Sequence, residues 1–174
     1  IALGANAAEG SSGVGQGQYA IAIGYDAAVA SGGAGTEQGD YAVAIGYQAG
    51  ETGQGDYSFG LGYLAGQQSQ GNRAVAIGYA SGQTTQGDYA IAIGDQAGEI
   101  AQGTQSISIG LQAGENTQGL ASIAIGKEAG RTTQASFATA IGHYAGSSNQ
   151  GSQAFAMGYH AARYDQGTGA IALG

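Results

Sequence analysis

The chain lacks the residues around which most compact domains are built. It has no proline, cysteine or tryptophan, and only one methionine and three phenylalanines among 174 residues. Without cysteine there is neither a disulfide framework nor a thiolate metal site. Any core must therefore be thin and built from Ala, Val and Ile side chains close to the backbone, which indicates an elongated body.

Basic residues are also scarce. Lys and Arg together number four and Asp and Glu together number twelve, which gives a formal net charge of -8. Nucleic-acid binding needs clustered Lys and Arg to neutralise phosphates, so we predict that the chain binds no nucleic acid. No apolar run approaches the ~20 residues that cross a bilayer, and no signal peptide is visible. We therefore predict no membrane insertion by this segment.

Glycine, by contrast, is abundant and periodic. A tetrad of apolar, small, apolar and Gly recurs along the chain, and from Gly46 to Gly174 its closing glycine returns at one constant spacing, that of Gly46 to Gly62. The stretch Tyr79–Gly94, YASGQTTQGDYAIAIG, is close to the ideal unit. Such a unit is too short for a helical repeat, which needs about 30 residues or more. Its A-I-A-I segment alternates with period two, as strands do, between turn-forming segments.

This pattern predicts an all-β fold, a single-stranded parallel β-solenoid of ten coils, mostly of about 16 residues. The missing prolines agree with it, because each coil must donate backbone N–H groups to the next. The closing glycine is predicted to have a positive φ, or to lie too near the next coil for a Cβ atom.

The first coils are longer than the rest. The spacings from Gly4 to Gly24 and from Gly24 to Gly46 both exceed the regular one, which predicts loop insertions near residues 5–12 and 28–33. The sequence opens and closes on IALG, the body of the repeat. We therefore expect residues 1–174 to be a single repetitive segment of a longer fibrous protein.

The two faces of the A-I-A-I strand are given opposite roles. The large residues are predicted to fill the coil as its core: Ile21, Ile23, Ile45, Ile77, Ile91, Ile93, Ile109, Ile125, Ile141 and Leu173. The small residues are then predicted to face outward and to pack against sister chains: Ala44, Ala76, Ala92, Ala124, Ala140 and Ala156. The alternative is that this small face abuts another layer of the same coil or is exposed.

A column of glutamines recurs once per coil. Stacked at strand spacing, their side-chain amides can donate and accept along the fibre axis, and we predict such a ladder. A ligand-binding role is the alternative. The predicted ladder comprises Gln38, Gln54, Gln70, Gln86, Gln102, Gln118, Gln134, Gln150 and Gln166.

Tyrosines stack in two further columns, with Arg73 interrupting the second, where its guanidinium can lie over a ring. Such rows suit binding to a saccharide or a protein surface; alternatively they cover the coil edges and order the turns. The columns are Tyr25, Tyr47, Tyr63 and Tyr79, and Tyr19, Tyr41, Tyr57 and Tyr89.

The charged residues do not form a recognisable catalytic pattern. Asp40 and Asp56 share a column one coil apart, which leaves open either a bound cation or solvated turn carboxylates. His143 and His160 are expected to lean to opposite sides of a strand, which argues against a joint metal site. There is no phosphate-binding loop and no Ser, His and acid trio. We predict no catalytic, cofactor-binding or metal residue, no cofactor and no enzyme activity.

The repeated A-I-A-I-G and A-V-A-I-G units resemble the head repeats of YadA-like trimeric autotransporter adhesins. In a longer Y-Q-A-G-x-T-x-Q-G form they are also similar to repeats in fibre proteins of phages and large DNA viruses. The resemblance implies a left-handed β-roll and a homotrimer. It extends to the Ile pair and the closing glycine of each unit, for example Ile91, Ile93 and Gly94.

These observations predict an extracellular fibre segment, displayed on a cell or virion surface, that acts as an adhesin or contacts a receptor. Its partners would be its own sister chains and a host surface protein or glycan, bound through the exposed rows and the inserted loops. The alternative is a purely structural spacer or filament-forming repeat. An ice-binding or carbohydrate-active solenoid is a weaker interpretation, since outward Thr pairs do not persist through the array.

Overall fold

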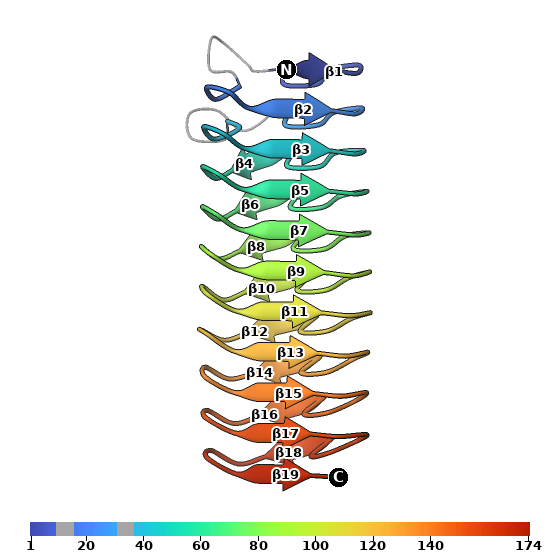
Figure 1. Cartoon of the computed structure of the whole chain (residues 1–174), viewed down its shortest axis with the longest axis vertical. Coiled ribbons are helices and arrows are strands. Elements are labelled where there is room, and N and C mark those ends of the chain that lie inside the picture. The colour runs from blue at the N-terminus through green and yellow to red at the C-terminus, as the bar shows by residue number, and fades with distance from the viewer. Residues whose placement is uncertain (10–15, 31–36) are drawn as a thin grey trace.

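The computed structural model describes residues 1–9, 16–30 and 37–174. In these ranges the chain winds into a parallel β-solenoid of about ten coils with a repeat of about 16 residues, as predicted (Figure 1). Each strand pairs in parallel with the equivalent strand of the next coil, so that Ile91 lies opposite Ile107 and Ile93 opposite Ile109. No described helix is long and apolar enough to span a membrane.

One sheet runs the full length of the molecule and forms its front in Figure 1. It is built from the A-I-A-I segments, whose alternation suits a pleated strand. Its strands are β1 (Ala2–Leu3), β2 (Ile21–Ile23), β3 (Val43–Ile45), β5 (Phe59–Leu61), β7 (Val75–Ile77), β9 (Ile91–Ile93), β11 (Ile107–Ile109), β13 (Ile123–Ile125), β15 (Thr139–Ile141), β17 (Phe155–Met157) and β19 (Ile171–Leu173).

A second sheet lies behind the first (Figure 1). Each of its strands ends on a glutamine of the invariant column. The repeat pattern does not predict these strands, because only that glutamine is constant. They are β4 (Thr52–Gln54), β6 (Gln68–Gln70), β8 (Thr84–Gln86), β10 (Ile100–Gln102), β12 (Asn116–Gln118), β14 (Thr132–Gln134), β16 (Ser148–Gln150) and β18 (Tyr164–Gln166).

The two long coils follow the regular path further than expected. The Asp26 N–H donates to the Ala5 carbonyl at 3.1 Å, and the Ala30 N–H to the Glu9 carbonyl at 3.0 Å. In the insertions predicted near residues 5–12 and 28–33, the first residues of each range therefore still follow the regular path of the coil. The remainder of both predictions falls largely on residues 10–15 and 31–36, which lie outside the described residues.

The interior of the coil is made of small side chains, not large ones. The predicted chain–chain face, Ala44, Ala76, Ala92, Ala124, Ala140 and Ala156, is fully buried within the chain at 0 % exposure. Ala124, Ala140 and Ala156 form one buried cluster with turn alanines such as Ala129 and Ala145. The predicted core is wrong: Ile21, Ile23, Ile45, Ile77, Ile91, Ile93, Ile109, Ile125, Ile141 and Leu173 all point to the outside, half-buried or exposed.

The physical reason for this reversal is the narrowness of the coil. Gly60 occupies an inward position that is alanine in most coils, and a Cβ atom placed there would lie 3.1 Å from the Ala65 carbonyl oxygen. That contact is already tight, so a branched side chain has no room between the turn and the sheet. Alternation with period two cannot distinguish the inner from the outer face, whereas the available space does.

The glutamine column lies inside the coil, in the space that the alanines leave. From Gln38 to Gln150 these side chains are 1–2 % exposed, and Gln166 is 7 % exposed. The Gln86 amide nitrogen donates to the Val75 carbonyl at 2.8 Å and to Gln102 Oε1 at 3.0 Å. The same two contacts recur in most coils, so each amide joins the two sheets of its coil and also bonds to the next coil.

The ladder changes at one point. Ser108 replaces the usual inward alanine, and its hydroxyl donates to Gln118 Oε1 at 2.6 Å. Near the N-terminal end, where the coils are longer, Gln38 Oε1 is buried without a partner. Elsewhere the column satisfies its own amides, as buried polar groups must.

The coil-closing glycines have φ values between 122° and 137°, a region that side chains rarely adopt. They also lie directly against the next coil: a Cβ atom on Gly94 would be 2.6 Å from the Gly110 carbonyl oxygen. Both reasons predicted for an obligatory glycine therefore apply at this position.

We predict that Gly94→Val lowers the free energy of unfolding by about 3 kcal/mol or more, because backbone strain adds to a steric clash. Chemical denaturation measures the loss. Gly167→Val is the matched control, since Gly167 has an ordinary φ and no atom within 4 Å of an added Cβ. Equal losses in the two variants would contradict this account of the glycine.

We further predict that Gln86→Leu lowers the free energy of unfolding by about 2–4 kcal/mol, because it leaves buried groups of two neighbouring coils without partners. Gln68→Leu, on the exposed start of β6, serves as the control and should change stability little. A variant at Gln86 as stable as this control would show that the ladder contributes no net stability.

Candidate binding surfaces

The large side chains excluded from the interior form an apolar stripe along the outer face of the first sheet. The stripe has two columns, one from the first and one from the last residue of the first-sheet strands from β2 to β19, and Thr139 is its one polar member. Leu61 is 38 % exposed and Met157 42 %, and the other members range from half-buried to exposed. A continuous apolar surface of this length is unusual on a monomeric soluble protein and indicates an interaction surface.

Tyrosine rows border both edges of this stripe. Tyr47, Tyr63 and Tyr79 stack with ring centroids 4.9 and 5.1 Å apart and nearly parallel planes. On the other edge Tyr41 and Tyr57 stack at 5.0 Å. Because the coils repeat at strand spacing, each ring rests on the ring of the coil before it, and the rows expose mainly ring edges and hydroxyl groups.

Arg73 takes the place of one ring in the second row. Its guanidinium carbon lies 5.4 Å from the centroids of both Tyr57 and Tyr89, as expected for cation–π contacts. Nη1 also donates to the Tyr89 hydroxyl at 2.8 Å. Arg73 is predicted to lie over one ring, and the structure places a tyrosine ring on each side of its guanidinium.

The aspartate column beside this row bonds to backbone amides. Asp56 Oδ1 accepts from the Asp40 N–H at 2.9 Å, Asn72 Oδ1 from the Asp56 N–H at 2.9 Å, and Asp88 Oδ1 from the Asn72 N–H at 2.8 Å. One oxygen of Asp56 thus caps the preceding coil. In the described part of the chain, no group of three or more His, Asp or Glu residues is arranged to hold a metal ion.

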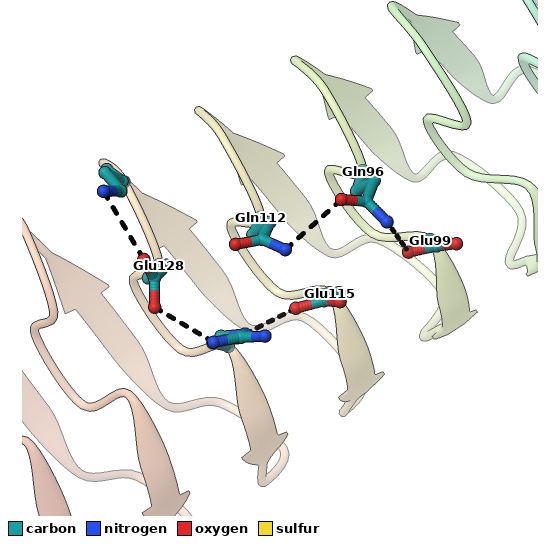
Figure 2. Close-up of polar contacts among 7 residues, drawn as sticks. Gln96, Glu99, Gln112, Glu115 and Glu128 are labelled. Atoms are coloured by element: carbon teal, nitrogen blue, oxygen red, sulfur yellow. Dashed lines mark hydrogen bonds and ion pairs between the residues drawn. The ribbon is translucent and has the colours of Figure 1, made fainter.

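A network of charged and amide side chains lies on the turn after the first sheet (Figure 2). Arg131 Nε contacts Glu115 at 2.5 Å and Nη1 contacts Glu128 at 3.1 Å. Glu99 accepts a hydrogen bond from Gln96 at 3.0 Å, and no ion pair reaches it within the described residues. Arg131 therefore relieves the repulsion at Glu115, whereas Glu99 has no cation beside it.

The pKa values follow from these contacts. Burial raises the pKa of Glu99 above its ordinary 4.5, and the charge of Glu115 adds to the effect. Burial also acts to raise the pKa of Glu128, but the hydrogen bond from Tyr144 and the charges of Arg131 and Lys127 outweigh it and lower that pKa. The Glu115 hydrogen bond raises the pKa of Arg131.

The two histidines lie together, contrary to the prediction that they lean to opposite sides. Their ring centroids are 6.0 Å apart, and His160 stacks on Tyr159 at 4.1 Å while His143 stacks on Tyr144 at 4.3 Å. Both Nε2 atoms are buried without a hydrogen-bond partner. Burial, together with the charges of Arg163 and His143, lowers the pKa of His160. Contacts with each other and with the neighbouring tyrosine rings hold the two histidine rings in place.

We predict that Glu99→Gln stabilises the protein at pH 7 by less than about 1 kcal/mol, since solvent screens this site. When folding raises the pKa of a carboxyl group, the protein loses stability as pH rises from the pKa of the unfolded state through that of the folded state. The advantage of the variant should therefore vanish as pH falls below the ordinary value of 4.5. Denaturation at a series of pH values from about 3 to about 8 measures it.

Gln is already the residue at this position in the two preceding coils, where Gln83 donates to Gln67 at 2.8 Å. A glutamine at position 99 extends that column without new geometry. Glu115→Gln is the contrasting variant, because it removes the ion pair with Arg131 and should not stabilise. Stabilisation by both changes would show that net charge, not the local pair, sets the effect.

Comparison with known proteins confirms the resemblance to the YadA-like head repeats. The model of the YadA head domain repeat matches the chain twice, at residues 16–49 and 69–97. No curated protein matches the chain, and no solved structure does. YadA-type adhesins are trimeric and exposed on the cell surface, and their head repeat is a non-catalytic structure. These two segments of the chain are therefore similar to the YadA head domain repeat.

Proposed function

We propose that this chain is a segment of a cell-surface adhesive fibre that assembles as a homotrimer through its apolar stripe. The observation that carries the proposal is that the largest apolar side chains lie outside the coil, not inside it. The non-catalytic, surface-exposed character of YadA-type adhesins supports a binding role on a cell in preference to a virion.

The geometry of the stripe favours sister chains as its occupant. Both columns run the length of the first sheet at constant strand spacing, so that an identical chain in the same register presents the same repeat at every coil. Closed rotational symmetry lets three such faces meet along one axis and buries all of them at once. Obligate interfaces of this kind resemble a hydrophobic core divided between subunits.

In this assembly the chain has two separate apolar regions with different functions. The alanine and glutamine interior stabilises one coil, and the isoleucine stripe joins the coils of different chains. The second sheet and the turns remain at the surface, where a host protein or glycan would bind. We retain the left-handed β-roll implied by the family as part of this proposal.

We predict that the segment sediments as a trimer and that the double variant Ile77→Glu with Ile93→Glu sediments as a monomer, because burying two carboxylates per chain is strongly unfavourable. Analytical ultracentrifugation gives the mass directly.

The matched control is Ile100→Glu, at an exposed outward position of β10 in the second sheet. It adds one carboxylate per chain to the opposite face, where the double variant adds two to the stripe, and it should leave the trimer intact. A wild-type monomer, or a trimer that survives the double change, would refute the assembly through the stripe.

A further inference from the structure

One coil differs from both of its neighbours in the turn before the first sheet. Neighbouring coils have Asp56-Tyr57 and Asp88-Tyr89 at this turn, whereas the coil between them has Asn72-Arg73. These six residues line a hollow of about 250 Å³ on the surface. We propose that this hollow is a binding site for a neutral saccharide, a proposal that rests on the adhesive function proposed above and assigns it a site.

Arg73 supplies hydrogen-bond donors to the hollow. A guanidinium has five N–H groups. One nitrogen, Nη1, donates to the Tyr89 hydroxyl, and no ion pair joins Arg73 to a carboxylate in the described part of the chain. The rings of Tyr57 and Tyr89 hold the guanidinium on both sides and so limit its motion. Its remaining N–H groups are therefore held in a fixed place, where they can donate hydrogen bonds to a ligand.

The two aspartates supply acceptors. The Oδ1 atoms of Asp56 and Asp88 accept backbone N–H groups of the preceding coils, which fixes each carboxylate in place. No hydrogen bond to the second oxygen of either carboxylate is found among the described residues. Asn72 lies between them and keeps the two negative charges two coils apart. Free acceptors therefore border the donors of Arg73.

This combination selects the class of ligand. Vicinal hydroxyl groups both donate and accept, so they match a site where donors and acceptors lie side by side. An anion would meet two carboxylates, and a cation would meet the guanidinium. The volume is below the roughly 300–1,000 Å³ of sites for drug-sized ligands, so it suits a single sugar ring. Binding at one such shallow site is weak, and a trimer would strengthen it through three copies.

The array offers a variant that removes the hollow and keeps the fold. Arg73→Tyr restores the residue that the neighbouring coils have at this position, so that the ring row becomes continuous from Tyr19 to Tyr89. Asp88→Asn is a second variant that retains an Oδ1 acceptor for the Asn72 N–H, as Asn72 itself does for Asp56. It replaces only the free acceptor by a donor.

The matched control is Asp95→Tyr, which extends the other tyrosine row by one ring outside the hollow. Saturation-transfer NMR on the assembled protein is the measurement. The neutral probes are the methyl pyranosides of galactose, glucose and mannose, and the acidic probes are glucuronic acid and sialyllactose.

We expect saturation transfer to at least one neutral pyranoside, retained in Asp95→Tyr. Binding should weaken about tenfold or more in Arg73→Tyr and in Asp88→Asn, the loss expected for a hydrogen bond to a charged group. Binding to no neutral pyranoside, binding only to the acidic probes, or undiminished binding in Arg73→Tyr would each overturn the proposal. If the protein is a trimer but binds no saccharide, only the proposed saccharide site is refuted. If it binds a neutral saccharide but is a monomer, only the proposed trimeric assembly is refuted.

Discussion

The narrow space between the two sheets of a coil is the constraint on which the rest of the molecule depends. Only a methyl group, a hydroxymethyl group or a flat amide fits there, as the tight surroundings of Gly60 show. Alanine and serine therefore fill the inward positions, and glutamine spans the remaining gap between the sheets. A core of this kind buries little apolar surface per residue, so hydrogen bonds and close backbone contacts must contribute a large part of the stability.

The same constraint determines the exterior. Large apolar side chains cannot enter the coil, yet the chain has one or two of them in every strand of the first sheet. They form a stripe that remains partly exposed in a single chain. The proposed trimer follows from the interior being too small for the largest apolar residues.

The period of the repeat and the closing glycine could be predicted because each depends on the backbone alone. Gly94 has no side chain whose orientation must be guessed, and its spacing from Gly78 and Gly110 is visible directly. The inward or outward direction of Ile91 and Ala92 could not be predicted in the same way, because alternation is symmetric and the usual rule places large apolar residues inside. The width of the coil, which decides between them, is a property of the folded turns.

The surface features were predictable to the extent that they depend on register. The stacking of Tyr63 on Tyr79 and the position of Arg73 follow from the repeat. The contact between His143 and His160 does not, because the turn backbone has a positive φ at His160 and turns that ring toward its neighbour. Side-chain directions at such turns need the local dihedral angles as well as the register.

The strict pairing of each coil with the next also has a consequence for how such a protein changes in length. A duplicated unit brings its own interior, its own glutamine and its own closing glycine, and it needs no compensating change elsewhere. Each additional copy lengthens the rod by one strand spacing, about 4.8 Å. The length of the rod is therefore set by the number of units that the chain contains.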